Sequence, residues 1–218
     1  MSHSSGLFDT AFDACPIVAI IRGVTPSEAA SVGRALYDAG IRIIEVPMNS
    51  PEPLKSIQIL SSALGEKAVI GAGTVLTVAE VEAVASAGGR LCVSPNTDPA
   101  VIKATRSLNL VSIPGVFSPT EVFAALAAGA DLLKLFPANS AGRDIFRNMK
   151  AVLPPETRVI AVGGVTFENA CECLAEGFAG VGAGAELYKP RRTVEEIYAS
   201  AKRLVSSLML LEERQISR

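Results

Sequence analysis

The run Ala130-Asp131-Leu132-Leu133-Lys134-Leu135-Phe136-Pro137 holds a short block of apolar residues interrupted by one lysine. In a strand with one face in water, apolar and polar residues alternate, whereas near-continuous apolar residues are typical of a strand covered on both faces. Strands of parallel sheets are usually covered in this way. The run therefore predicts a buried strand of a parallel sheet.

Seven similar runs occur along the chain, and amphipathic helical stretches separate them. The predicted strands are residues 17–21, 41–46, 68–71, 91–94, 110–113, 132–135, 159–162 and 180–182. Helices are predicted to begin near residues 25, 51, 77, 98, 118, 142, 166 and 193, many with Ser, Thr or Asp followed by Pro or Glu. These repeats predict an α/β protein, a (β/α)8 TIM barrel that forms a single domain over residues 1–218.

An open, doubly wound parallel sheet is the alternative arrangement of such repeats. That fold usually carries a Gly-x-Gly-x-x-Gly turn after its first strand, but Ile21-Arg22-Gly23-Val24-Thr25 stands there instead. The barrel is therefore favoured. A short helix over residues 7–14 is expected to cap the bottom of the barrel.

Length and composition indicate a soluble protein with a sizeable core. The chain has 218 residues, is 49% hydrophobic, and carries 20 basic and 22 acidic residues for a net charge of −2. The charges are interspersed, so no basic face predicts binding to nucleic acid or to an anionic membrane. No apolar run is long enough to span a bilayer, and no signal segment begins the chain. We expect a cytoplasmic protein with small-molecule partners.

Only one histidine occurs, His3, in the Ser-rich opening of the chain. A zinc site of the usual histidine type, a Ser-His-Asp triad and a Cys-His pair all need an imidazole near the core. The four cysteines, Cys15, Cys92, Cys171 and Cys173, show no paired framework and are predicted to be reduced. Neither a metal site nor a cofactor is expected.

Lys134 is the most unusual residue, because it places a cation at the end of an apolar strand. Burial disfavours the ammonium form, so such a lysine is more readily a free amine that can attack a carbonyl and form a Schiff base. Glu45 ends another apolar run in the same way. The pair suggests amine-plus-acid carbonyl chemistry. Two structural alternatives are that Lys134 reaches water past the rim, and that Glu45 forms an ion pair with Lys134 or Arg22.

Further polar residues and glycines follow the predicted strands, at the rim where TIM-barrel enzymes carry their active sites. Gly163-Gly164 and Gly182-Ala183-Gly184 can bring backbone N–H groups close to an anion, and a helix start adds a favourable dipole. These glycines indicate a phosphate cup, although tight turns alone would also need them. Thr74 ends the run Gly71-Ala72-Gly73-Thr74 with a hydroxyl that either holds a carboxylate or caps the next helix.

Taken together, these residues resemble the class I 2-keto-3-deoxy-6-phosphogluconate and 2-keto-3-deoxy-6-phosphogalactonate aldolases. The resemblance extends over residues 15–190. It rests on seven segments: Ile21-Arg22-Gly23, Glu45-Val46-Pro47-Met48-Asn49-Ser50-Pro51, Gly71-Ala72-Gly73-Thr74-Val75, Ser94-Pro95-Asn96, Pro114-Gly115, Lys134-Leu135-Phe136-Pro137 and Val162-Gly163-Gly164-Val165.

The resemblance implies that Lys134 is the Schiff-base lysine and that Glu45 transfers protons. In that family the lysine attacks the C2 ketone of the substrate, and the C3–C4 bond then breaks to give pyruvate and glyceraldehyde 3-phosphate without a metal. Arg22 would face the substrate carboxylate, and Pro95 and Phe136 would line the pocket around Lys134. Members of the family are commonly homotrimers.

Three positions bear on which sugar acid is used. Gluconate-type enzymes typically have arginine and threonine where this chain has Asn49 and Ser50, and threonine where it has Val162. The pattern resembles the galactonate-type enzyme, whose substrate differs at C4, so we expect 2-keto-3-deoxy-6-phosphogalactonate as substrate. A gluconate-type or 4-hydroxy-2-oxoglutarate aldolase is the alternative enzyme. A barrel that binds phosphate ligands without turnover is the alternative from another class.

One departure from the family concerns the phosphate cup. The family often has a serine that touches phosphate at the position after the final glycine, where this chain has Ala185. The backbone amides of Gly163, Gly164 and Gly184 would then bind phosphate without that hydroxyl. Weaker affinity for phosphate is therefore a hypothesis.

Overall fold

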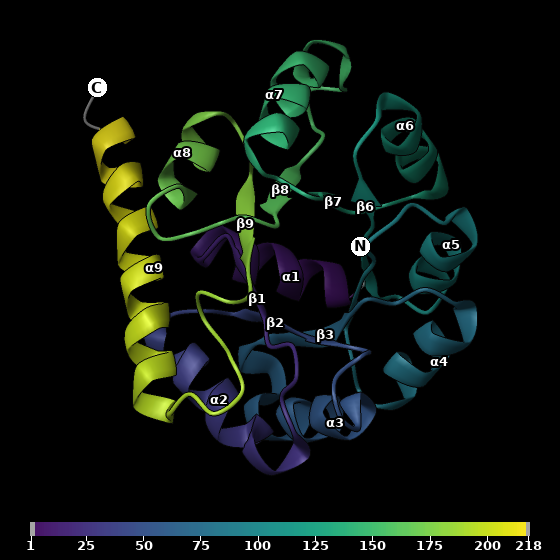
Figure 1. Ribbon diagram of the computed structural model, residues 1–218. Coiled ribbons are helices and arrows are strands. Elements are labelled where there is room, and N and C mark those ends of the chain that lie inside the picture. Colours follow the sequence, from purple (N-terminus) through teal and green to yellow (C-terminus); the bar gives the residue numbers. More distant parts are fainter. Residues whose placement is uncertain (1–2, 217–218) are drawn as a thin grey trace.

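The chain forms a barrel of parallel strands surrounded by helices (Figure 1). The structure is a computed structural model that describes the backbone of residues 3–216 and the side chains of residues 6–208. The strands are β1 (Ile17–Ile20), β2 (Ile43–Pro47), β3 (Val69–Gly73), β4 (Leu91–Val93), β5 (Val111–Ile113), β6 (Gly115–Val116), β7 (Leu133–Leu135), β8 (Val159–Val162) and β9 (Gly180–Ala183).

The α-helices alternate with the strands and lie around them in chain order in Figure 1, except that α1 crosses the centre. They are α1 (His3–Ala14), α2 (Pro26–Ala39), α3 (Pro53–Leu64), α4 (Val78–Ser86), α5 (Pro99–Ser107), α6 (Pro119–Ala128), α7 (Ser140–Met149), α8 (Ala170–Ala175) and α9 (Val194–Ile216). The predicted (β/α)8 barrel is thus confirmed, and so is the short N-terminal helix, which begins at His3 rather than residue 7. No helix of the described residues is both long and apolar enough to cross a membrane.

The fifth strand differs from the prediction, which ended it at Ile113. Pro114 divides this segment into β5 and β6, because proline has no N–H group to donate to a neighbouring strand. The strand order β5-β4-β3-β2-β1-β9-β8-β7-β6 therefore begins and ends on one continuous segment. Ser94 N donates to Ile113 O at 3.1 Å on one side, and Lys134 N donates to Pro114 O at 2.9 Å on the other. The barrel closes around this segment.

Two apolar layers follow from the period of two along each strand. One layer lies between the strands and the outer helices. The other fills the barrel and includes Val18, Ile43 and Ile160, together with Phe8 and Phe12 of α1. Helix α1 thereby closes the end of the barrel where the strands begin, with two aromatic rings stacked at 5.6 Å between their centres. The end formed by the carboxyl ends of the strands stays open.

Candidate active site

A cavity of about 420 Å³ opens at the carboxyl ends of the strands. Most residues that the sequence analysis assigned to a ligand line it: Arg22, Glu45, Thr74, Pro95, Lys134, Phe136, Val162, Gly163, Gly164, Gly182, Gly184 and Ala185. Asn49 and Ser50, which bear on the choice of sugar acid, do not line it. The structure thus brings together residues that lie far apart in the sequence.

The same cavity is lined by residues that the sequence analysis did not assign: Ile20, Val165, Thr166 and Glu186. Ile20 looks like any other core residue, so the sequence carries no signal for it. Val165 and Thr166 directly follow the assigned Gly163-Gly164 pair, and Glu186 directly follows Ala185. Including the whole of each loop, rather than its glycines alone, would have found these three.

Lys134 and Glu45 point into the barrel because of their positions in the strands. Side chains two residues apart share one face of a strand. Leu132 and Ile43 belong to the inner layer, so Lys134 and Glu45, two residues further along, occupy the next inward positions. They form the floor of the cavity above the apolar filling.

Burial shifts the pKa values of both groups toward their neutral forms. The Glu45 side chain belongs to a residue only 2% exposed, and desolvation raises its pKa to about 7 against the attraction of Lys134. Lys134 is 7% exposed, and desolvation lowers its pKa against the attraction of Glu45. Its Nζ lies 4.8 Å from the centre of the Phe136 ring. A lysine that reached water past the rim would not be buried in this way.

Glu45 is not part of a structural ion pair. Within the described residues its Oε2 has no hydrogen-bond partner. Lys134 and Arg22 attract its charge, but neither forms an ion pair with it at contact distance. A buried carboxyl oxygen without a partner is unusual in a folded protein. Here it faces a cavity, where a ligand or water can supply the missing partner.

Gly73 provides the space that the Glu45 carboxyl group occupies. A Cβ atom on Gly73 would lie 1.7 Å from Glu45 Oε2 and 2.2 Å from its Cδ, far inside contact distance. Gly73 pairs with Pro47 in the sheet, so its backbone is fixed by the neighbouring strand. The absent side chain therefore decides where the Glu45 carboxyl group lies.

Arg22 lies on the loop after β1, and its side chain is held by the loop after β2. Arg22 Nη1 donates to Asn49 Oδ1, and Gly23 N donates to Ser50 Oγ at 3.0 Å. The guanidinium group lines the cavity and is exposed. A guanidinium group in this position is able to pair with a carboxylate group.

Thr74 lines the cavity and does not cap a helix. The N-cap of α4 is Thr77, whose side chain accepts from Glu80 N. Thr74 has a φ of +58°, a left-handed conformation that costs free energy for a residue with a Cβ atom. Its hydroxyl thus remains available to the cavity.

The glycine loop after β8 forms another side of the cavity. Gly163 and Gly164 have φ values of +88° and +81°, which favour glycine at both positions. In the described part of the chain, the backbone N–H groups of Gly164, Val165, Ala185 and Glu186 donate to no other group. Free N–H groups on two neighbouring loops suit an oxyanion.

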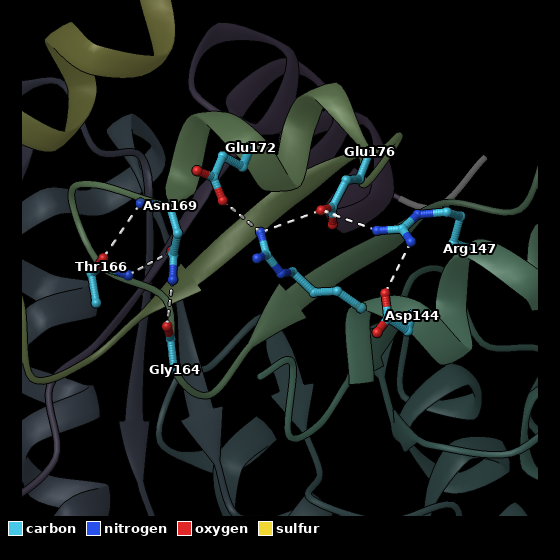
Figure 2. A network of polar contacts seen from close by, with 8 residues as sticks. Asp144, Arg147, Gly164, Thr166, Asn169, Glu172 and Glu176 are labelled. Carbon is cyan, nitrogen blue, oxygen red and sulfur yellow. Dashed lines mark hydrogen bonds and ion pairs between the residues drawn. The ribbon is translucent and has the colours of Figure 1, made fainter. Parts of the chain in front are cut away.

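Helix α8 begins later than the sequence predicted. The expected start near Thr166 is four residues early. Residues 166–169 form a turn in which Asn169 Oδ1 accepts from Thr166 N at 2.8 Å and Thr166 Oγ1 accepts from Asn169 N at 3.4 Å (Figure 2). The helix starts at Ala170 and is only 6 residues long. The glycine loop therefore offers individual N–H groups and not the start of a helix.

Val162 ends β8 with its side chain at the cavity wall. A Cβ atom on the neighbouring Gly182 would lie 2.7 Å from Val162 Cγ2, so Gly182 makes room for the valine. Pro95 and Phe136 complete the apolar part of the wall. Among the described residues, no group of three or more His, Cys, Asp or Glu side chains is placed to hold a metal ion.

Comparisons with known proteins agree with this geometry. The family model "KDPG and KHG aldolase" matches residues 8–202. The chain is 46% identical over 182 residues to a probable 2-dehydro-3-deoxy-6-phosphogalactonate aldolase of Rhizobium meliloti (strain 1021). The match covers 84% of this chain and 86% of that relative. The chain is 42% identical over 192 residues to the 2-dehydro-3-deoxy-6-phosphogalactonate aldolase of Escherichia coli (strain K12), with 88% and 94% covered.

Solved structures are similar over most of the chain. One described as native KDPGal superposes with a TM-score of 0.89 at 41% identity, covering 91% of this chain and 96% of that one. A 2-keto-3-deoxy-6-phosphogluconate aldolase of Zymomonas mobilis ATCC 29191 superposes with a TM-score of 0.82 at 27% identity, covering 91% and 96%.

Proposed function

The chain belongs to the KDPG and KHG aldolase family, and we propose that it is a class I aldolase that cleaves 2-dehydro-3-deoxy-6-phosphogalactonate to pyruvate and glyceraldehyde 3-phosphate. One observation carries the proposal: a buried amine, Lys134, and a buried carboxyl group, Glu45, share one cavity. Both lie where a ketone can reach them. The named relatives support the choice of substrate.

The first step needs an uncharged amine. Desolvation lowers the pKa of Lys134, so its nitrogen is free to attack the C2 ketone of the substrate. The resulting carbinolamine carries a hydroxyl group that must leave as water. Glu45, with a pKa raised to about 7, is protonated often enough near neutral pH to donate that proton. The product is an iminium ion.

The second step needs a base. Glu45, now ionised, accepts the proton of the C4 hydroxyl, directly or through a water molecule. The electron pair of the C3–C4 bond moves into the iminium group, which becomes an enamine, and glyceraldehyde 3-phosphate leaves. Glu45 returns its proton to C3, and water hydrolyses the new iminium ion to pyruvate and free Lys134. A carboxyl group with a pKa of about 7 suits both directions of proton transfer.

The two ends of the substrate are anionic, and the cavity offers a partner for each. Arg22 faces the carboxylate from the β1 side. The free N–H groups of the glycine loop and of Ala185 and Glu186 face the phosphate from the β8 and β9 side. Between them, Val162 presents a methyl group where a threonine would present a hydroxyl, and this contact supports the preference for the galactonate epimer.

Steady-state kinetics with both phosphorylated epimers tests the proposal. We expect a higher kcat/KM on the galactonate epimer than on the gluconate epimer or 4-hydroxy-2-oxoglutarate. An equal or higher kcat/KM on either alternative substrate would contradict the assignment. Binding of the phosphorylated acids without turnover would indicate a phosphate-binding barrel instead.

The proposal extends to assembly and location. We propose a homotrimer, as the resemblance implies. The exposed apolar side chains of Leu108, directly after α5, and Phe123, on the neighbouring helix α6, are available for subunit contacts. We propose a cytoplasmic location because a sugar acid that carries both a carboxylate and a phosphate group does not cross a bilayer unaided. Light scattering of the purified protein checks the trimer, since a monomer mass would refute it.

A further inference from the structure

The loop of residues 163–166 needs further contacts to keep a single backbone conformation. Gly163 and Gly164 both have left-handed φ values, and the loop lines the cavity along its length. Without other contacts, two consecutive glycines also have more conformational freedom than residues with a Cβ atom. The loop needs an additional tie if its N–H groups are to keep one direction.

Asn169 supplies that tie with both ends of its amide group (Figure 2). Its Nδ2 donates to Gly164 O at 2.8 Å, and its Oδ1 accepts from Thr166 N at 2.8 Å. Its own backbone N donates to Thr166 Oγ1 at 3.4 Å. Asn169 does not line the cavity, so it contacts the loop from the outer side.

The geometry of the peptide group fixes the direction of the Val165 N–H once the Gly164 carbonyl group is held. In a trans peptide the carbonyl oxygen of one residue and the N–H of the next point to opposite sides. Because Asn169 holds Gly164 O on the outer side, the Val165 N–H points to the other side, which is the cavity. Because Asn169 also takes the Thr166 N–H, that group does not compete for a ligand.

Helix α8, which begins directly after Asn169, is fixed to α7 by ion pairs (Figure 2). Arg143 lies 3.1 Å from Glu172 and 3.4 Å from Glu176, and Arg147 lies 3.5 Å from Glu176. The Arg143 side chain is largely buried. Helix α7 follows the strand of Lys134, so these contacts connect the support of the glycine loop to the segment after the reactive lysine.

We propose that Asn169 is a positioning residue that aims the Val165 N–H at the phosphate group of the substrate. The inference rests on the proposed function for the identity of the ligand, and it names a residue outside the cavity as a determinant of phosphate affinity. It also explains why a loop of two left-handed glycines can bind an anion without the serine that Ala185 replaces.

Three variants test this role. Asn169→Ala removes both side-chain bonds, and Asn169→Asp keeps an acceptor for Thr166 N but cannot donate to Gly164 O. Asn148→Ala is the matched control, because Asn148 Nδ2 makes the same kind of bond to a backbone carbonyl, Asp144 O, at 3.0 Å on α7. Each protein is titrated with inorganic phosphate and assayed with the phosphorylated substrate.

We expect both Asn169 variants to raise the Kd for inorganic phosphate and the KM for substrate by about tenfold, the effect of one hydrogen bond. Their kcat should stay within about twofold of wild type, since Lys134 and Glu45 are untouched. Asn148→Ala should match wild type in every measurement. The amount of pyruvate trapped on Lys134 by borohydride should be unchanged in all variants.

Two results would overturn the inference. One is an unchanged Kd for inorganic phosphate in Asn169→Ala. The other is a parallel loss of kcat and of pyruvate trapping, which would show general damage to the site rather than a role in phosphate binding. A wild-type protein that binds phosphate but traps no pyruvate would refute the proposed function while leaving the phosphate comparison of the variants valid.

Discussion

Replacing Gly73 with alanine tests how the position of Glu45 is set. The new Cβ atom would lie 1.7 Å from Glu45 Oε2, and since nonbonded atoms rest about 3.5 Å apart, the carboxyl group must retreat by about 1.5 Å or more. A misplacement of about 1 Å at a reacting group can cost about 100-fold in rate. We therefore expect kcat/KM to fall about 100-fold in Gly73→Ala.

The effect on stability should be smaller than the effect on activity. Gly73 is not among the glycines with positive φ, so its backbone accepts alanine. Overpacking a well-filled interior costs about 1–3 kcal/mol. Gly33→Ala is the control, because its Cβ would lie 2.3 Å from Leu60 Cδ2, in contact with a flexible side chain outside the cavity. That variant should keep its kinetics.

The assay combines kinetics with a double-mutant cycle. Glu45→Asp draws the carboxyl group back by one methylene, so the loss of melting temperature caused by Gly73→Ala should be smaller in the Glu45→Asp background. Wild-type kcat/KM in Gly73→Ala would refute the reasoning. Strictly additive losses of melting temperature in the double variant would also contradict the contact with Glu45.

Three other predictions concern pH, the phosphate cup and specificity. The first step needs protonated Glu45, and burial raises its pKa to about 7, so kcat/KM should fall as the pH rises above about 7. Ionisation of Glu45 in the folded state is disfavoured by up to about 3 kcal/mol, so Glu45→Gln should be more stable than wild type above pH 7, with the difference shrinking toward pH 4.5 in thermal melts. Equal stability at all pH values would contradict this. Ala185→Ser should lower KM for the phosphorylated substrate, and a KM no lower than wild type would count against the missing hydroxyl. Val162→Thr keeps the shape of the wall and should raise the ratio of gluconate to galactonate kcat/KM about tenfold, so an unchanged ratio would exclude this position as the discriminator.

The sequence could predict the barrel and the inward direction of the two reactive groups. Continuous apolar strands at regular spacing indicate a closed parallel sheet, and the period of two places Lys134 and Glu45 on the inner face once Leu132 and Ile43 are core residues. The strand ends then bring the polar residues to one rim. The fold was within reach of the sequence for this reason, whereas the family and the function came from the resemblance of the motifs.

Contacts between distant loops could not be predicted. The space that Gly73 leaves for Glu45 depends on the register of β2 and β3, in which Glu45 pairs with Gly71 and Pro47 with Gly73. The bond from Arg22 to Asn49 likewise joins two loops. Both contacts depend on the detailed positions of backbone and side-chain atoms, which no sequence pattern encodes.

Two local boundaries differ from the prediction. Helix α8 begins at Ala170, after a turn in which Thr166 and Asn169 exchange hydrogen bonds. The division of the fifth strand follows from Pro114. These residues are visible in the sequence, but a period-based prediction assigns whole segments and gives little weight to single residues at their boundaries.

The most direct measurement is borohydride reduction in the presence of pyruvate, followed by mass spectrometry of the peptide that contains residue 134. The account predicts one added pyruvate-derived group on Lys134 and none on Lys134→Met or Lys134→Arg, both of which should also lose carbon–carbon cleavage. An unmodified Lys134, or cleavage that survives either substitution, would contradict the central claim that this buried amine attacks the ketone.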